Sequence, residues 1–399
     1  MTGPLPLRNV RVADFTWAAA GPYATLLLAS LGAQVVKITS SRATGGFPKQ
    51  RAADIDRYLN YNKLGITLDL KTPRGAGLAK DLIGVCDLVI ENYRPGTMGR
   101  FGLGYQDLLQ VKPDIIMVSG SSLGADGPQS QYAGFAPIFG TMSGLSHVTG
   151  YADGIPTELR LMVDYTVGQA TAYSALVALY HLRTTGQGQY IDLASRDAIT
   201  CLIGEFVLDD QLNCHASSAE ANPRIGNRDL IMAPHGAYPC RGEDAWITIA
   251  VATQEEWEAL CDAMGRPEWL SDERLADGYG RWVHQEEMDG QIGAWTEGYT
   301  PFELMDLLQE KGVAAVPSYS ARDLFEDGHL MERHFSQKVG VPPGGEYTVI
   351  NAPWLLNGHR PGALRHAPGP GEHNTEIFEG LLGVPLNELE RLIEEGIVS

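Results

Sequence analysis

Short apolar runs alternate with helical runs along the first 120 residues, and this alternation constrains the fold more than any other feature. The apolar runs occupy residues 10–15, 34–39, 65–70, 87–93 and 114–120, and the helical runs occupy residues 21–33 and 72–86. Strands that alternate with helices indicate a parallel sheet covered on both faces. Strands as continuously apolar as VVKI and IIMV fit burial on both sides. The pattern predicts the α/β class, with a doubly wound, Rossmann-like parallel sheet as a large domain over residues 1–210.

The sequence changes character after Asp210. Residues 211–229 are rich in Asn, Ser, Pro and Gly, a composition typical of a linker. Two β runs, AYPC and AWITIAVA, follow and are joined by RGED, which favours a hairpin-like turn. Helical runs at 254–264, 284–296 and 301–311 and an apolar run at 313–320 come next. We therefore expect a smaller α+β domain over residues 225–325.

Charge and composition exclude several classes of partner. The chain of 399 residues carries a net charge of −19, which disfavours nucleic acid and anionic membranes as partners. Residues 1–200 hold 17 basic and 15 acidic side chains and residues 201–399 hold 13 and 34, so an anionic small ligand would find its cations in the first half. No apolar run approaches the roughly 20 residues that cross a bilayer. The N-terminus has no apolar stretch that would serve as a secretory signal.

The cysteines and the missing motifs narrow the chemistry further. The cysteines are odd in number and scattered, without a CxxC pair: Cys86, Cys201, Cys214, Cys240 and Cys261. This pattern favours thiols in a reducing compartment over a disulfide framework or a zinc site, so we expect a cytoplasmic protein with no bound metal. No GxGxxG, GxxxxGK[ST], HExxH or GxSxG motif occurs, so the sheet lacks the glycine loop that cradles a pyrophosphate.

Three segments of the first half have residues suited to a ligand. The segment AAAGPYAT (18–25) either lets a ligand approach the backbone or forms an ordinary tight turn. Lys71 follows a strand, where it can meet a phosphate or lie on a solvated edge. Residues 91–105 follow another strand, at the end where ligands dock in such sheets. Arg94 and Arg100 suit an anion, and the rings of Tyr93 and Phe101 suit the face of an adenine. The alternative is a charged surface loop whose aromatic side chains only pack against the protein.

Asp164 is the fourth candidate. It precedes a nearly continuous apolar run from Tyr165 to Arg183, which predicts a long helix that ends at TTGQGQ and leads into a short strand. An aspartate at a helix start is among the best N-caps, and for an isolated residue capping is the simpler interpretation. The alternative is a nucleophile whose charge is stabilised by the amides at the start of the helix.

Taken together, the candidate segments resemble the class III (family III) CoA-transferases, a family that includes formyl-CoA, carnitine and benzylsuccinate CoA-transferases. The related α-methylacyl-CoA racemases share the fold. The resemblance extends from the N-terminal LRNVRVADFTWAAAGPYATLLLASLGAQVVKI to GEHNTEIFEGLLG near the C-terminus. It also includes NYNKLGITLDLKTPRG, VIENYRPGTMGRFGLGY, SGLSHVTG, RTTGQGQYIDLA and APHGAYPCRGEDAWITIAV.

The resemblance implies a fold, a partner and a set of site residues. Residues 330–399 would return to the large domain, and two chains would interlock with active sites between domains. Asp164 would be the nucleophile, and CoA contacts would fall on Leu68, Lys71, Asn92, Tyr93, Arg100 and Phe101. A carboxylate with an ordinary pKa near 3.9 is ionised at neutral pH and needs no activating base. The implied reaction proceeds through an aspartyl anhydride and an aspartyl-CoA thioester. CoA enters as a thioester substrate, and no cofactor is bound permanently.

Departures from the family pattern separate its branches. Racemases carry a histidine where this chain has Phe135, and many transferases carry an acid where it has Ala136. Ala19 replaces the glutamine of formyl-CoA transferases, and RDLIMA replaces their glycine run, which counts against oxalate as the acceptor. Thr39 replaces a usual acid after VVKI. A racemase or epimerase, and a non-catalytic CoA-binding subunit of a hetero-oligomer, remain as alternatives.

The expected acceptor follows from the same positions. Ala19, Phe135 and Phe139 suggest a roomy, apolar acceptor pocket. The segments FAPIFG and NRDLIMAPHGAYPC resemble most the benzylsuccinate branch, which moves CoA from succinyl-CoA to an aryl-substituted succinate in anaerobic toluene degradation. That branch uses two homologous subunits, so the partner is either an identical chain or a homologous one in a heterodimer or heterotetramer. In the second case this chain would be the catalytic subunit.

Overall fold

The computed structural model describes residues 5–40, 57–213 and 224–399 of the chain. The chain divides into two compact units. Unit 1 comprises residues 1–146, 158–213 and 329–399, and unit 2 comprises residues 147–157 and 214–328. The polar linker expected over 211–229 begins later than its composition indicates, because helix α10 continues to Asn213. Most of the remainder of that segment lies outside the described residues.

Unit 1 is built on a six-stranded parallel sheet, in the order β3-β2-β1-β4-β5-β6. The strands are β1 (Arg11–Asp14), β2 (Gln34–Thr39), β3 (Leu64–Thr67), β4 (Leu88–Glu91), β5 (Ile116–Ser121) and β6 (Tyr190–Ala194). The register aligns Ala13 with Val36 on one side and with Val89 on the other. The expected doubly wound parallel sheet is confirmed. Strand β3 ends at Thr67, earlier than expected, because the following residues turn into the next helix.

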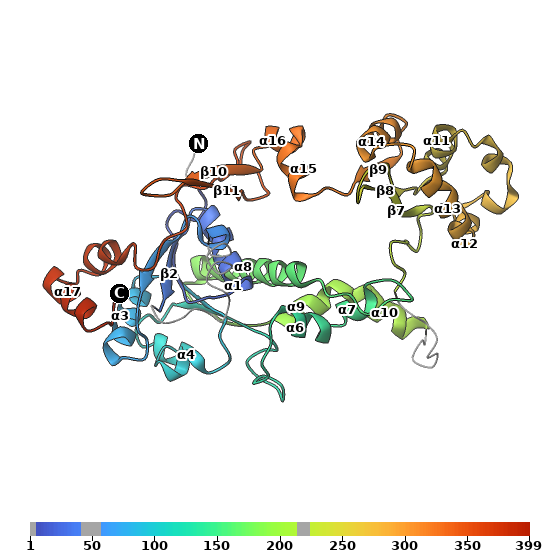
Figure 1. The fold of residues 1–399 in the computed structure, drawn as a ribbon. Coiled ribbons are helices and arrows are strands. Elements are labelled where there is room, and N and C mark those ends of the chain that lie inside the picture. The colour runs from blue at the N-terminus through green and yellow to red at the C-terminus, as the bar shows by residue number, and fades with distance from the viewer. Residues whose placement is uncertain (1–4, 41–56, 214–223) are drawn as a thin grey trace. The chain divides into compact units, whose positions relative to one another are not determined.

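Alternate residues of each strand pack into two separate cores, because successive side chains point to opposite faces of a sheet. On one face, α1 (Ala20–Ser30) and α8 (Arg160–Thr185) lie side by side (Figure 1) and cover Val12 and Ile90. On the other face, α3 (Pro73–Gly84) covers the opposite side of the same strands. Helix α3 begins as its sequence predicts, with Thr72 accepting a hydrogen bond from Gly75 N and with Pro73 in the first turn.

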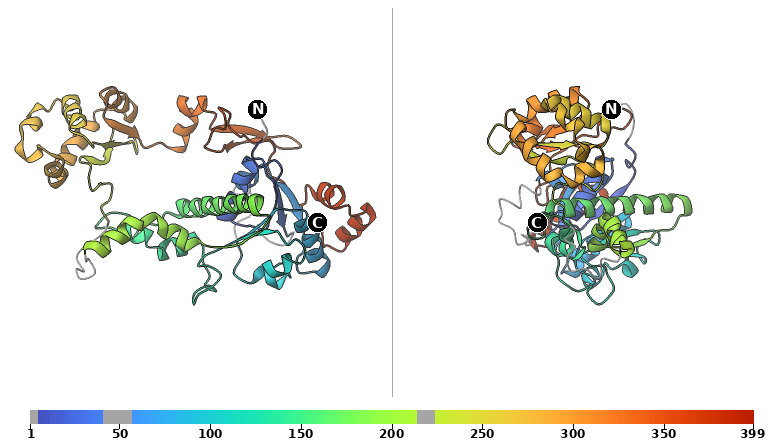
Figure 2. Two further views of the ribbon diagram at one scale, coloured as in Figure 1. Left: turned by 180° about the vertical axis from the view of Figure 1, so that it is seen from behind. Right: turned by 90° about the vertical axis from the view of Figure 1, so that its right-hand side faces the viewer.

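The C-terminal segment completes the second core. Ile377 of η5 (Glu376–Leu381) and Leu392 of α17 (Leu386–Glu394) pack with the residues under α3. Figure 2 shows these C-terminal helices beside the sheet from behind. The sequence indicated two helices here, but the first is a single π-helical turn. An antiparallel hairpin of β10 (Ser336–Gly340) and β11 (Glu346–Ile350) was not predicted.

Unit 2 is a small α+β module around its own core. Strands β7 (His235–Pro239), β8 (Trp246–Ala250) and β9 (Ala314–Pro317) form an antiparallel sheet. Its larger helices are α11 (Gln254–Met264), α13 (Gln285–Thr296) and α14 (Pro301–Glu310). Capping boxes at Thr253 and Thr300 begin α11 and α14.

The remaining elements are short. In unit 1 and at its borders they are α4 (Thr97–Arg100), α5 (Tyr105–Leu108), α6 (Ala136–Met142), α7 (Leu145–Val148), α9 (Ser195–Thr200), η1 (Cys201–Ile203), α10 (Gly204–Asn213) and α16 (Gly328–Glu332). In unit 2 they are η3 (Pro267–Ser271), η4 (Glu273–Leu275), α12 (Gly278–Val283) and α15 (Ala321–Glu326). Among the described residues, no helix is both long and apolar enough to pass through a membrane.

Candidate active site

The sheet has a switch point between β1 and β4. From β1 the chain moves outward to β2 and β3, and it then returns to the other side of β1 to form β4. In open α/β sheets, ligands bind beside the carboxyl ends of the two strands at such a point. Here those ends are followed by Thr16-Trp17 after β1 and by Asn92-Tyr93 after β4.

The Asn92 side chain clamps the backbone of Trp17. Its Oδ1 accepts a hydrogen bond from Trp17 N at 2.9 Å, and its Nδ2 donates to the Trp17 carbonyl oxygen at 2.9 Å. Asn92 therefore joins the two loops of the switch point. Asn92 was expected to contact CoA, and its amide already has these two partners on the protein.

The turn between β1 and α1 is held in an unusual backbone conformation. Ala18 has a φ of 62°, in the left-handed region, and Ala19 follows in the right-handed helical region. A left-handed residue followed by a right-handed one brings successive N–H groups together into a concave nest that suits an anion. The turn is also tight, since a Cβ at Gly21 would lie 2.5 Å from Thr16 Cβ and 3.0 Å from Asn92 Cγ. Only glycine fits at this position.

A buried charged cluster lies beneath the turn, and the sequence reasoning missed it. Asp14, which is 0% exposed, lies 3.5 Å from Lys37 Nζ and 3.2 Å from Lys63 Nζ. Its carboxylate also accepts hydrogen bonds from the hydroxyls of Thr16 and Thr25, each at 2.6 Å. Burial raises the pKa of Asp14, but the two ammonium groups and the two hydroxyls outweigh it and hold the pKa at about 2. The carboxylate is therefore ionised at any physiological pH.

Asp164 is not at the start of its helix. Helix α8 begins at Arg160, so Asp164 is its fifth residue, and no side-chain cap forms at Leu159. The expectation of a cap-like position was wrong. The physical reason is that Val163, which is 1% exposed, anchors the first turn against α6, where a Cβ at Gly140 would lie 3.1 Å from a Val163 methyl group. The carboxylate therefore does not serve as the cap of its own helix.

The position of Asp164 follows from the contact one turn further along. A Cβ at Gly168 would lie 2.7 Å from the Ala20 carbonyl oxygen and 2.9 Å from Tyr23 Cδ1, so α8 meets the first turn of α1 there. Residues four apart lie on one face of a helix, about 6 Å apart along the axis. Helices α1 and α8 run in the same direction, since each leads into the amino end of a parallel strand. Asp164 therefore lies at the amino end of α1, on the face that carries the Ala18–Ala20 turn.

The expected acceptor-pocket residues gather on the same side of the sheet. Ala19 is in the turn itself, and the Phe135 ring, 56% exposed, meets the Trp17 ring edge-on with 6.0 Å between centroids. Phe139 is buried in α6, one residue before the Gly140 contact with α8. Trp17 was not singled out from the sequence, although it stands in the same motif as Ala19.

The expected CoA contacts are divided between the two faces of the sheet. Tyr93 and Phe101 are partly buried against the core that lies under α3, and Leu68 is fully inside that core. Burial raises the pKa of Tyr93 to about 12, so its hydroxyl stays protonated. Lys71 and Arg100 are exposed, and Arg100 donates a hydrogen bond to Thr97 Oγ1 at 2.9 Å. The aromatic groups thus belong to the core under α3, whereas Asn92 Cβ and Thr171 Oγ1 of α8 both lie within 4.0 Å of a Cβ built at Gly120.

Two further polar side chains lie at the ends of strands, Glu91 in β4 and Thr39 in β2. Burial raises the pKa of Glu91, at the end of β4, to about 6, although a hydrogen bond from Tyr93 N at 2.8 Å opposes the shift. The Thr39 hydroxyl donates to the Ile66 carbonyl oxygen at 3.2 Å and so links the ends of β2 and β3. Across the described ranges, no cluster of three or more His, Cys, Asp or Glu side chains could hold a metal ion.

Comparison with known proteins identifies similar sequences over the whole chain. The model of CoA-transferase family III matches residues 7–374. A succinyl-CoA–D-citramalate CoA-transferase from Chloroflexus aurantiacus is 34% identical over 99% of this chain and 98% of the relative. A formyl-CoA:oxalate CoA-transferase from Bradyrhizobium sp. is 30% identical over 98% of this chain and 97% of the relative.

A solved structure has the same fold. It is the crystal structure of a CAIB/BAIF family protein from Brucella suis, which superposes with a TM-score of 0.82 at 26% sequence identity. The match covers 95% of this chain and 100% of that chain.

Proposed function

The chain belongs to CoA-transferase family III, and we propose that it moves CoA from succinyl-CoA to a 2-substituted succinate through covalent intermediates on Asp164. One observation carries this proposal. Gly168 of α8 meets Ala20, and from this contact we infer that Asp164, one helical turn earlier, lies beside a turn whose amides suit an anion. A nucleophilic carboxylate and a group of oxyanion donors are the two parts that acyl transfer requires.

The proposed reaction needs no redox step and no metal. An Asp164 oxygen attacks the carbonyl carbon of the donor thioester, the C–S bond breaks, and CoA leaves as a thiolate. The thiolate attacks the Asp164 carbonyl carbon of the resulting anhydride, which releases the donor carboxylate and forms an aspartyl-CoA thioester. The acceptor carboxylate then attacks this thioester and expels the thiolate. In the last step the thiolate attacks the acceptor carbonyl of the second anhydride, and the Asp164 carboxylate is regenerated.

Each step passes through a tetrahedral oxyanion beside Asp164. The amides of Ala18, Ala19 and Ala20 are the donors we propose for it, because they converge at the amino end of α1. Preorganised donors of this kind typically contribute about 10²- to 10³-fold each to kcat.

The CoA moiety is proposed to lie along the strand ends on the other side of the switch point. Tyr93 and Phe101 would face the adenine, with Leu68 behind them in the core, and Lys71 and Arg100 would meet phosphates. Asn92 would contact the ligand near the thioester end, since it joins the two loops. CoA is a substrate in this scheme, and no cofactor is held permanently.

The acceptor is proposed to be a succinate with a substituent at C2. D-citramalate, in the name of one relative, has that skeleton, and so has benzylsuccinate. The edge-on pair of Trp17 and Phe135 and the small side chain of Ala19 favour an apolar substituent over a hydroxyl. We therefore propose an aryl-substituted succinate such as benzylsuccinate as the acceptor. A hydroxylated succinate is the second candidate, favoured by the name of that relative.

A second chain is proposed to complete the active enzyme. Tyr173, Val177 and Tyr180 follow one another along the outer face of α8, and the two tyrosines are 70% and 71% exposed. An apolar row of this kind on a long helix suits burial against another subunit. We propose an interlocked homodimer or a heterodimer with a homologous chain, located in the cytoplasm. Sedimentation analysis should give a dimer for the wild type, and a monomer would contradict the proposal.

Trapping the covalent intermediate tests the proposed function. The protein is incubated with succinyl-CoA, treated with borohydride or hydroxylamine, and mapped by mass spectrometry. Modification should occur at Asp164 and be absent in Asp164→Asn, while Asp210→Asn, which changes an exposed acid of α10, should be labelled normally. Label on another residue would contradict the assignment of the nucleophile.

An acceptor panel tests the finer assignment. Benzylsuccinate, malate, citramalate and oxalate are compared at equal concentration with succinyl-CoA as the donor. The highest kcat/KM is expected for benzylsuccinate and the lowest for oxalate. Transfer to citramalate alone would replace the aryl acceptor with a hydroxylated one and leave the CoA-transferase mechanism intact. Solvent deuterium entering C2 of a chiral 2-methylacyl-CoA would instead favour a racemase.

A further inference from the structure

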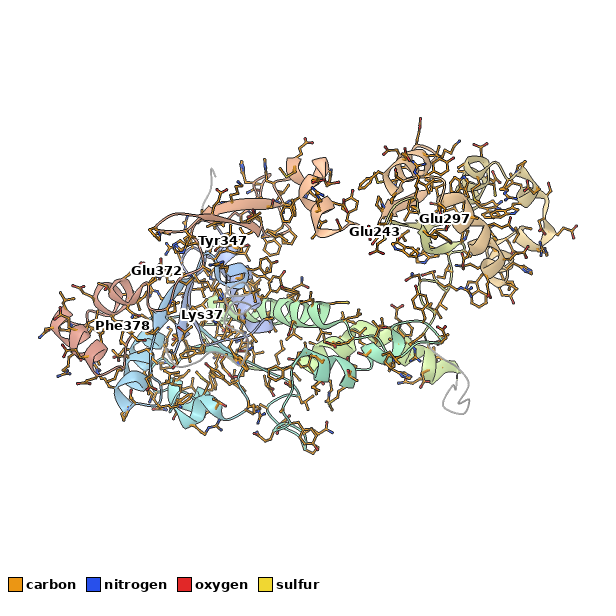
Figure 3. The ribbon with its side chains drawn as sticks, viewed as in Figure 1. Lys37, Glu243, Glu297, Tyr347, Glu372 and Phe378 are labelled. Atoms are coloured by element: carbon orange, nitrogen blue, oxygen red, sulfur yellow. The ribbon has the colours of Figure 1, made fainter. Side chains whose placement is uncertain are left out.

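The buried cluster of Asp14, Lys37 and Lys63 takes no part in the proposed reaction, yet it contacts the turn beside Asp164. Lys37 lies on β2, inside the sheet layer of unit 1 (Figure 3). Its Nζ donates a hydrogen bond to the Thr16 carbonyl oxygen and another, at 3.3 Å, to Thr16 Oγ1. Lys63 Nζ donates to the Pro22 carbonyl oxygen at 2.9 Å. The two lysines therefore hold both ends of the segment from Thr16 to Pro22.

The neighbours of both lysine amines are oxygens that can accept hydrogen bonds. Lys63 Nζ has four oxygen neighbours, on Asp14, Pro22, Thr25 and Asn60, within 3.2 Å. Each of these oxygens can accept, since the shortest contact of the Thr25 hydroxyl as a donor is the one to Asp14, at 2.6 Å. The neighbours of Lys37 can likewise accept, since the Thr16 hydroxyl also donates to Asp14. Two ammonium groups and one carboxylate leave these three residues with one positive charge in total.

The peptide between Thr16 and Trp17 is fixed from both sides. Its carbonyl oxygen accepts from Lys37, and its N–H donates to Asn92 Oδ1. The next peptide has its carbonyl oxygen on Asn92 Nδ2, so its N–H, that of Ala18, points away from Asn92, because the two groups of a trans peptide point in opposite directions. The orientation of the Ala18 amide is thus set by Lys37 and Asn92 together.

We propose that Lys37, held in place by Asp14, is a positioning residue for CoA transfer: it fixes the Thr16–Trp17 peptide against Asn92 and so aims the amides of the Ala18–Ala20 turn at the anion formed beside Asp164. The inference rests on the proposed function for the identity of that anion. The net positive charge of Asp14, Lys37 and Lys63 would also stabilise that anion, because it lies on the other side of the amides that face the anion.

Lys37→Met tests the proposal by removing the ammonium and keeping the length of the side chain. We expect kcat to fall about 10- to 100-fold, the range for a misplacement of roughly 1 Å, with little change in the KM for succinyl-CoA. Lys112→Met removes a lysine paired with Asp114 away from the turn and should leave kcat unchanged. A folded Lys37→Met protein with the wild-type kcat, or one whose loss is confined to KM, would overturn the proposal.

A double-mutant cycle with Asn92→Ala separates positioning from a general loss of structure. If Lys37 and Asn92 act on one peptide, the second substitution adds little to the first, and the cycle shows a coupling of about fivefold or more. Independent effects that multiply would overturn the proposal and leave Asn92 as a direct CoA contact. If Lys37→Met does not fold, Lys37→Gln, which keeps an N–H donor, takes its place in the cycle, with a smaller loss expected.

Hydrogen exchange gives a readout that does not depend on activity. Amides in residues 15–23 should exchange faster in Lys37→Met and in Asn92→Ala than in the wild type, and at the wild-type rate in Lys112→Met. Unchanged exchange in both site variants would overturn the positioning role. If the wild-type protein carries no label at Asp164, the proposed function fails, whereas the exchange data still decide whether Lys37 and Asn92 hold the turn.

Discussion

Gly168→Ala should separate Asp164, the proposed nucleophile, from the turn that we propose stabilises its oxyanions. The new Cβ would lie 2.7 Å from the Ala20 carbonyl oxygen, whereas ordinary contact begins at 3.4 Å, so α8 or the turn must move by the difference, about 0.7 Å. The carbonyl is backbone and cannot rotate away. Overpacking of this kind costs about 1–3 kcal/mol, and the better helix propensity of alanine offsets about 1 kcal/mol of it. We expect a net loss of stability of about 0–2 kcal/mol and a fall in kcat of up to about 10²-fold, because Asp164 lies on the displaced face.

Gly77→Ala is the matched control. Gly77 lies inside α3, and a Cβ there has nothing within 4 Å, so the substitution should stabilise the protein by about 0.5–1 kcal/mol and leave kcat unchanged. Thermal melting should therefore rank Gly77→Ala above the wild type and Gly168→Ala below it, and coupled assays should show a loss for Gly168→Ala alone. Wild-type kcat in Gly168→Ala would refute the inferred position of Asp164 beside the Ala18–Ala20 turn.

Three further predictions concern the buried polar groups. Asp14→Asn should destabilise the fold by about 3–5 kcal/mol, since it leaves buried ammonium groups without their carboxylate. The pKa of Asp14 is about 2 in the folded protein and 3.8 ordinarily, so the stability that Asp14 contributes is present above about pH 4 and lost toward pH 2. The urea midpoint of the wild type should therefore fall between pH 4 and pH 2 through this residue, and that of Asp14→Asn should lack this part of the fall. Glu91→Gln should stabilise the fold at pH 8 by about 2 kcal/mol, because folding raises the pKa of Glu91 from 4.5 to about 6. This gain in stability should vanish toward pH 4.5, and equal gains at both pH values would contradict the prediction. Arg281→Met in unit 2 should lower the urea midpoint measured by tryptophan fluorescence, because the guanidinium lies 5.2 Å from the Trp257 ring and donates hydrogen bonds to two buried carbonyl oxygens. Each buried carbonyl left without a donor costs about 1–3 kcal/mol of stability. An unchanged midpoint would refute this prediction.

The layered architecture was predictable because its signals are local. Apolar strands, the Thr72-Pro73 helix start and the RGED turn each depend on a few neighbouring residues, and each of them holds in the structure. The β10–β11 hairpin was not predictable in the same way. Its strands, SQKVG and EYTVI, contain few apolar residues, and Val339 and Val349 become buried only through contacts with Leu26 and Tyr61, far away in the sequence.

The candidate site contains residues that the sequence singled out, and their roles remain predictions, whereas its geometry did not follow from the sequence. The segment around Asp164 was recognised, but propensity alone does not reveal that Val163 extends the helix by a turn through its packing near Gly140. The charged cluster did leave a signal, since Asp14 directly follows the apolar Val12-Ala13 of β1 and Lys37 stands between Val36 and Ile38 in β2. A charge inside a buried strand requires a partner, and two opposite charges on neighbouring strands predict each other.

The second core of unit 1 draws its residues from both ends of the chain. Val36 and Met117 share it with Phe378 and Val398, so the face of the sheet under α3 remains partly uncovered until the ribosome has passed residue 398. The sheet itself is complete at Ala194, about 200 residues earlier. At the usual synthesis rate of about 5–20 residues per second, that face is without its cover for roughly 10–40 s, while the larger part of unit 2, residues 214–328, is made. This face of the sheet therefore stays open to contacts with other chains until residues 377–398 have been made.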